Sequence, residues 1–165
     1  MDRLILLRHG QAEPGSETGE DFDRRLAPHG IVESRAMGLR LAEMGFVPDV
    51  ALVSTAARAR GTWDAVGLAF PNADVRFEDD LYHADSAAVR SFAFEAGAAS
   101  ASATVMVVGH NPGLQELTVA LMREGHAPSS LIARAHRRYP TAAASVFLID
   151  SEGRPHADGL FFPER

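Results

Sequence analysis

A short apolar run near the start of the chain, Leu4-Ile5-Leu6-Leu7, passes directly into the polar tripeptide Arg8-His9-Gly10. An unbroken apolar run bounded by charged residues is typical of a strand that is buried on both faces. Two further runs of this kind follow, from Asp49 to Val53 and from Thr104 to Val108. Because helical patterns separate the runs, the sequence predicts a three-layer α/β sandwich in which helices cover both faces of a mostly parallel sheet.

The segments between these strands carry helix start and stop signals. From Pro28 to Gly45 the chain has a broad apolar stripe and a glycine at its end. Asn111 and Pro112 predict a helix start, because asparagine caps free amides and proline pre-sets the first helical position. That helix should run to about Glu124. The other expected elements are a helix capped by Ser54 or Thr55 up to Leu68, a helix capped by Asp85 or Ser86 up to Gly97, and short strands at Val75 to Phe77 and Ser145 to Ile149.

Length and composition narrow the class of protein. The chain has 165 residues, which suits a single domain over residues 1–165. It contains no cysteine, which excludes disulfide frameworks, thiolate metal sites, iron–sulfur clusters and cysteine-dependent phosphatases. All 16 basic residues are arginines, so Schiff-base lysines and a P-loop ending in Gly-Lys-Ser/Thr are excluded too. Any cationic side chain that binds phosphate must therefore be an arginine.

The charge balance and the N-terminus bear on partners and location. With 16 basic and 22 acidic residues the formal net charge is −6, whereas a nucleic-acid-binding protein should present a dominant basic face. The apolar run from Leu4 to Leu7 is too short for a signal-peptide core or a membrane span. We therefore expect a cytoplasmic protein with neither a nucleic-acid nor a membrane partner.

Histidines and arginines follow the three predicted buried strands. The first strand runs into Arg8 and His9, the second is followed by Arg58, and the third runs into His110. In an open α/β sheet, ligands bind beyond the carboxyl ends of the strands, so these four side chains should meet at one edge. No metal-ligand spacing accompanies them, and we expect no metal and no cofactor.

Two imidazoles and two guanidinium groups suit phosphoryl transfer. A neutral imidazole can attack phosphorus and carry the phosphoryl group as a covalent intermediate. Arginine binds phosphoryl oxygens bidentately and stays charged at any physiological pH. Gly10 allows the backbone beside the nucleophile to approach the phosphate closely, and Arg58 should lie near the positive end of a helix.

These motifs resemble those of the histidine phosphatase superfamily, also called phosphoglycerate mutase-like, over nearly the whole chain. Arg8-His9-Gly10 after an N-terminal strand is similar to the first motif of that family, and the segment from Ser54 to Thr62 is similar to its second. The segment from Val107 to Gly113 resembles the variant found in the small SixA-type phosphohistidine phosphatases. The short chain, the segment from Asp21 to Leu26 and the pair Leu81-Tyr82 also fit that branch.

The resemblance implies a role for each matching residue and a six-stranded α/β sandwich. His9 would carry the phosphoryl group, Arg8 and Arg58 would clamp it, and His110 would complete the pocket. The implied phosphate- or substrate-binding neighbours are Gly10, Gln11, Arg24 and Asn111. Superfamily members that cleave phosphomonoesters use a carboxylic acid to protonate the leaving group, and the candidates here are Glu78, Asp79 and Asp80. None of the three lies in a clear motif, which favours a phosphohistidine substrate, because an imidazole leaves more readily than an alkoxide.

The sequence therefore predicts a metal-independent phosphatase that hydrolyses protein phosphohistidine through a phosphorylated His9. Its partner would be a phosphorylated protein, such as a phosphotransfer protein, or else a small phosphate ester. Two alternatives remain: a small-molecule phosphomonoesterase of the same superfamily, and a non-catalytic module that binds a phosphorylated ligand. A binding module would show no turnover, and a monoesterase would have a higher kcat/KM for sugar or nucleotide phosphates than for phosphohistidine.

Overall fold

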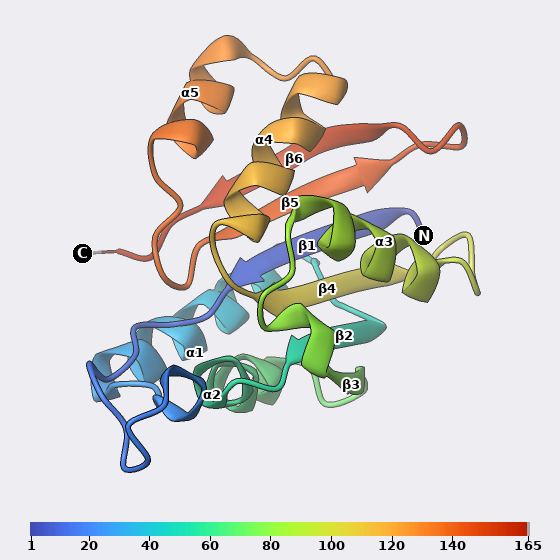
Figure 1. The fold of residues 1–165 in the computed structure, drawn as a ribbon. Coiled ribbons are helices and arrows are strands. Elements are labelled where there is room, and N and C mark those ends of the chain that lie inside the picture. The colour runs from blue at the N-terminus through green and yellow to red at the C-terminus, as the bar shows by residue number, and fades with distance from the viewer. Residues whose placement is uncertain (165) are drawn as a thin grey trace.

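The computed structural model describes residues 1–164 and contains one six-stranded sheet with the strand order β3-β2-β4-β1-β5-β6 (Figure 1). β1 lies at the centre, parallel to β4 on one side and antiparallel to β5 on the other. β2 is parallel to both β3 and β4, and β6 is antiparallel to β5. The sheet is thus mostly parallel, as predicted, with β5 reversed. The strands are β1 (Arg3–Arg8), β2 (Val50–Ser54), β3 (Asp74–Glu78), β4 (Thr104–Gly109), β5 (Ala144–Ile149) and β6 (Pro155–Phe161).

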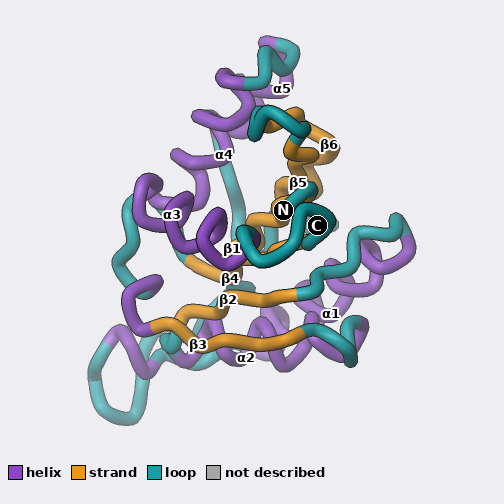
Figure 2. The backbone as a smooth tube through the Cα atoms, turned by 90° about the vertical axis from the view of Figure 1, so that its right-hand side faces the viewer, coloured by secondary structure: helices purple, strands orange, loops and turns teal. Residues whose placement is uncertain are grey.

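Helices cover both faces of the sheet, so the three-layer prediction is confirmed (Figures 1 and 2). One core joins α1 and α2 to the face of β1 that carries Ile5 and Leu7. The other joins α3, α4 and α5 to the opposite face, where Leu4 and Leu6 point. All four leucine and isoleucine side chains are fully buried, as expected for a strand between two helical layers. The helices are α1 (Pro28–Glu43), α2 (Ala57–Val66), α3 (Ser86–Gly97), α4 (Gly113–Glu124) and α5 (Ser129–Arg137), with short 3₁₀ helices η1 (Asp21–Asp23), η2 (Gly67–Ala69) and η3 (Asp79–Leu81).

Most helix boundaries agree with those predicted from the sequence, but the predicted N-caps of α2 and α4 do not cap these helices. Asp85 caps α3 as predicted, since its carboxylate accepts a hydrogen bond from the amide of Ala88. α2 begins at Ala57, later than expected, and the Ser54 side chain is directed to the site described below. α4 begins at Gly113, so Asn111 is not its cap. The Asn111–Pro112 bond is cis, and the Asn111 amide donates to the carbonyl of Tyr139 instead.

Two elements, β6 and α5, were not predicted. β6 has the sequence PHADGLF, which contains neither an apolar run nor a clean alternation. It is a strand because it pairs with β5 at the edge of the sheet, which is tertiary context rather than local preference.

In the described part of the chain, no helix combines the length and apolarity that a bilayer crossing requires.

Candidate active site

The site lies where β2, β4 and β1 end side by side. Their adjacency brings together the residues that follow each strand: His9 after β1, the start of α2 after β2, and His110 after β4. The imidazole rings of His9 and His110 lie 5.2 Å apart, centre to centre. The charges of Arg8, Arg58 and Arg24 all act on His9. The structure thus gathers the four side chains that the sequence placed at one edge.

His9 is buried and electrically neutral near neutral pH. Its exposed fraction is 7%, and burial lowers the pKa of its ring from 6.5 to about 3. The positive charges of the neighbouring arginines contribute to this lowering, and the hydrogen bond to Gly10 opposes it. Nδ1 lies 2.7 Å from the Gly10 carbonyl oxygen, and a carbonyl can only accept, so Nδ1 carries the ring proton. The lone pair of the neutral ring is therefore on Nε2.

His110 is also held neutral, and Ser54 orients it. Its pKa is lowered to about 3, chiefly by burial, and the neighbouring His9 and Arg58 contribute to this lowering. Its Nε2 shares a hydrogen bond of 2.8 Å with Oγ of Ser54, the last residue of β2. Within residues 1–164, Nδ1 of His110 is buried without a hydrogen-bond partner. A bound oxyanion could share a proton with that nitrogen.

Arg58 stands in the first turn of α2 with only 6% of its surface exposed. Its Nη1 donates to the main-chain oxygen of Asp21 at 2.8 Å, and its Nη2 donates to Oδ2 of Asp21 at 3.0 Å. Its Nε is buried and makes no hydrogen bond to any described residue. The positive end of α2 adds to the field of the guanidinium, which favours an anion at this place.

Arg8 and Asn111 are anchored together on the loop before β5. Nη1 of Arg8 and Nδ2 of Asn111 donate to the same acceptor, the carbonyl of Tyr139, at 3.0 and 2.9 Å. Tyr139 is itself buried, and its hydroxyl donates to the carbonyl of Leu6 at 2.6 Å. Both side chains are thereby fixed relative to β1.

Asp21 and Tyr82 belong to the site, although neither of them was predicted to have a role in it. Oδ1 of Asp21 accepts a hydrogen bond of 2.9 Å from Nε of Arg24, and Oδ2 accepts one from the Tyr82 hydroxyl. The Tyr82 ring lies edge-on to His110 with a centroid separation of 5.6 Å. Both residues lie in segments that resemble the histidine phosphatase superfamily. The contact of the Asp21 carboxylate with Arg58 joins residues that are far apart in the chain, so no short sequence pattern predicts it.

The loop that carries His9 is fixed from beneath by α1 and α2. The Gly10 amide donates to Thr62 Oγ1 at 2.9 Å, and the Gln11 amide donates to Oε1 of the buried Glu33 at 2.9 Å. A Cβ on Gly10 would lie only 2.5 Å from Ser34 Oγ, so this position needs glycine. Gly10 therefore serves close packing against α1 in this structure.

Comparisons with known proteins agree with this geometry. The sequence profile of the histidine phosphatase superfamily (branch 1) matches residues 4–86. The chain belongs to the histidine phosphatase superfamily. An uncharacterized protein of Mycobacterium tuberculosis, Rv1276c, is 31% identical over 129 residues, which make up 78% of each chain.

Solved structures place the chain in the SixA-type branch of this superfamily. A protein of Agrobacterium tumefaciens assigned as the phosphohistidine phosphatase SixA superposes with a TM-score of 0.82 at 30% identity and 98% coverage of both chains. A second protein with the same assignment, from Nakamurella multipartitia, gives a TM-score of 0.83 at 27% identity, covering 99% of this chain and 97% of that one. The superfamily assignment supports phosphatase activity.

The three expected general acids, Glu78, Asp79 and Asp80, lie at the end of β3 and in η3. Asp79 and Asp80 are exposed. Within the described residues, none of their side chains forms a hydrogen bond or ion pair with His9, Arg58 or His110. The Gln11 side chain is likewise exposed, and this residue contributes a backbone amide contact instead.

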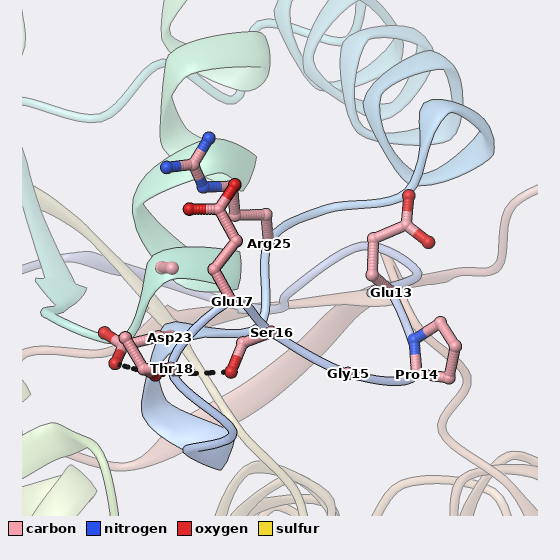
Figure 3. A pocket seen from close by; sticks show the side chains of 9 residues that line it. Glu13, Pro14, Gly15, Ser16, Glu17, Thr18, Asp23 and Arg25 are labelled. Atoms are coloured by element: carbon pink, nitrogen blue, oxygen red, sulfur yellow. Dashed lines mark hydrogen bonds between the residues drawn. The ribbon is translucent and has the colours of Figure 1, made fainter.

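A cavity of about 730 Å³ lies beside Ala57, the residue before Arg58, and none of His9, Arg58 and His110 is among its lining residues. The loop that follows β1 forms most of its wall, and Figure 3 shows Thr18 hydrogen-bonded to both Ser16 and Asp23. The lining includes three carboxylates and one arginine: Glu13, Glu17, Asp23 and Arg25.

In the described part of the chain, no cluster of histidine, aspartate and glutamate could hold a metal ion.

Proposed function

We propose that this chain is a metal-independent phosphohistidine phosphatase that works through a phosphorylated His9. The observation that carries the proposal is the pair of neutral, buried imidazoles 5.2 Å apart, with Arg8, Arg24 and Arg58 around His9. A neutral imidazole is the nucleophilic form of histidine, and the arginines supply charge for phosphoryl oxygens.

The two chemical steps use the tautomer of His9. In the first step Nε2 attacks phosphorus, a P–N bond forms at His9, and the bond from phosphorus to the substrate breaks. The departing imidazole of the substrate keeps the electron pair of that bond and leaves as a neutral ring, because its other ring nitrogen already carries a proton. In the second step water attacks phosphorus, inorganic phosphate is released, and His9 returns to its neutral state. The hydrogen bond from Nδ1 to Gly10 holds the ring in place throughout.

The arrangement of carboxylates favours a substrate with a P–N bond. Asp21 is the carboxylate hydrogen-bonded to Arg58, and its hydrogen bond from Tyr82, together with the two arginines, holds its pKa well below the usual range. It is therefore ionised at neutral pH and is a poor proton donor. An imidazole leaving group needs less help from an acid than an alkoxide does, which supports phosphohistidine over a phosphomonoester.

A phosphorylated protein is the partner that we propose. The SixA assignments of structural relatives point to this class of substrate, and within residues 1–164 the elements form the six-stranded domain with no second sheet inserted. A phosphotransfer protein that displays an exposed phosphohistidine would have the required chemistry.

A substrate panel with added chelator tests the proposal. Phosphohistidine on a phosphotransfer protein should be hydrolysed with a higher kcat/KM than sugar or nucleotide phosphates, and a chelator should leave the rate unchanged. The reverse preference would identify a small-molecule phosphomonoesterase. Oxyanion binding without turnover of any substrate would identify a binding module.

A further inference from the structure

We propose that Asp21 is a positioning residue, whose carboxylate fixes the guanidinium of Arg58 and ties the η1 turn to the η3 turn across the rim of the site. This inference rests on the proposed phosphatase function, because the effect of Asp21 would be exerted through the arginine that binds the phosphoryl group.

Every acceptor that Asp21 offers is used within the site. Its main-chain oxygen and its Oδ2 accept from the two terminal nitrogens of Arg58, at 2.8 and 3.0 Å. Its Oδ1 accepts from Arg24 at 2.9 Å, and Oδ2 also accepts from the hydroxyl of Tyr82. A side chain with 53% of its surface exposed thus joins Arg24 of its own turn to Arg58 and Tyr82 from two other segments.

The contact with Asp21 decides which edge of Arg58 is left for a ligand. A guanidinium is planar and offers two kinds of paired edge, one with both terminal nitrogens and one with Nε and a terminal nitrogen. Asp21 takes up the first edge, and Nε of Arg58 has no partner within residues 1–164. Asp21 therefore leaves the Nε edge, which lies deeper along the buried side chain, for phosphoryl oxygens.

Tyr82 extends this contact to the second histidine. Its hydroxyl binds Asp21, its ring lies edge-on to His110 at 5.6 Å, and the guanidinium of Arg58 lies 5.7 Å from its ring centre. Phe22, next to Asp21, packs edge-on against the same ring at 5.0 Å. The two turns are thus held together through polar and aromatic contacts over Arg58.

The charge of Asp21 makes two opposite outcomes possible, which is why the inference can be tested. A carboxylate repels a phosphoryl dianion, so an Asp21 that only filled the anion site would weaken binding. An Asp21 that orients Arg58 strengthens binding and raises the rate, because charge-assisted hydrogen bonds depend on direction. We expect the second effect to be larger.

The test is Asp21→Asn, with Asp23→Asn as a matched control. Asp23 lies in the same 3₁₀ turn and carries the same charge, but its carboxylate accepts from Thr18 rather than from an arginine. For Asp21→Asn we expect kcat for p-nitrophenyl phosphate to fall about tenfold or more, and the calorimetric Kd for tungstate to rise by about tenfold. Asp23→Asn should stay within about twofold of the wild type in both quantities, because surface changes of this kind have small effects.

A double-mutant cycle separates positioning from general damage. In an Arg58→Gln background, Asp21→Asn should have almost no further effect on kcat or on the Kd for tungstate, because its action passes through Arg58. Tyr82→Phe should show a smaller loss than Asp21→Asn, and the melting temperature of Asp21→Asn should stay close to that of the wild type.

Three outcomes would overturn the inference: an unchanged kcat in Asp21→Asn, a lower Kd for tungstate with an undiminished kcat, or full additivity with Arg58→Gln. The second outcome would make Asp21 a competitor of the substrate anion. A wild-type protein without turnover would defeat the proposed function instead, and the tungstate constants would then decide the role of Asp21 alone.

Discussion

His9 and His110 follow different strands, and their rings meet 5.2 Å apart because β1 and β4 are parallel neighbours that end at the same level. The register pairs Arg8 with Gly109, so the residues that come next along the two strands reach the site together. Burial then lowers the pKa of both rings to about 3, which keeps them neutral without any partner carboxylate. The parallel pairing of the two strands thus accounts for the position of the two rings, and their burial accounts for their neutral charge state.

The lowered pKa values predict how stability depends on pH. In the unfolded chain both rings regain a pKa near 6.5, so between about pH 6.5 and pH 3 the unfolded state binds more protons than the folded state. The free energy of unfolding should therefore be highest above pH 6.5 and should decrease as the pH falls from 6.5 towards 3. Melting temperatures measured between about pH 7 and pH 5, above the range where carboxylates titrate, should fall less steeply for the double variant His9→Gln/His110→Gln than for the wild type. Equal slopes for the two proteins would contradict the neutral, buried state of the rings.

Arg58→Lys should lose most of the activity. A lysine ammonium cannot donate to Asp21 from one planar edge while presenting a second edge to the phosphoryl group, so we expect kcat/KM to fall by about 100-fold. Arg60→Lys is the control, because Arg60 lies on the same helix but donates to the Thr55 carbonyl and stacks over Phe77. Steady-state kinetics with p-nitrophenyl phosphate compare the two variants, and a rate near that of the wild type in Arg58→Lys would show that the planar guanidinium is not required.

Glu33→Ala should lower both stability and activity. The buried Glu33 carboxylate accepts from the Gln11 amide and from the Thr141 hydroxyl, so it joins the loop after β1 to the loop before β5. Removing it leaves those donors without their acceptor, and we expect the free energy of unfolding to fall by about 1–3 kcal/mol and kcat to fall because His9 is less firmly held. Urea denaturation should detect the loss, whereas the exposed Glu43 on the same helix, changed to alanine, should shift stability by no more than about 0.5 kcal/mol. A loss no greater than that of Glu43→Ala would rule out this support for the loop.

The part of the fold that could be predicted is the part with a local signal. Buried parallel strands such as Leu4 to Leu7 are unbroken apolar runs, and the residues that follow them lie at the ligand-binding edge of the sheet by topology. That is why His9, Arg58 and His110 could be brought together from sequence. β6 has no such run, because its pairing partner rather than its own pattern makes it a strand.

The part of the site that could not be predicted depends on contacts between distant loops. Asp21 meets Arg58 and Tyr82 across separations of 37 and 61 residues, and no spacing rule connects them. Asn111 is a good helix cap by type, yet its side chain is used to bind the Tyr139 carbonyl. Glu78, Asp79 and Asp80 were named as candidate proton donors although none of them lies in a clear motif. The carboxylate bound to Arg58 is that of Asp21, in η1.

Rapid-quench trapping of the phosphorylated enzyme tests the central claim most directly. The wild type, mixed with a ³²P-labelled phosphohistidine protein and quenched in alkali within milliseconds, should carry label on His9, and acid should release that label. His9→Ala should carry none and show no turnover, while still binding tungstate. Label on another residue, or turnover by His9→Ala, would contradict the account.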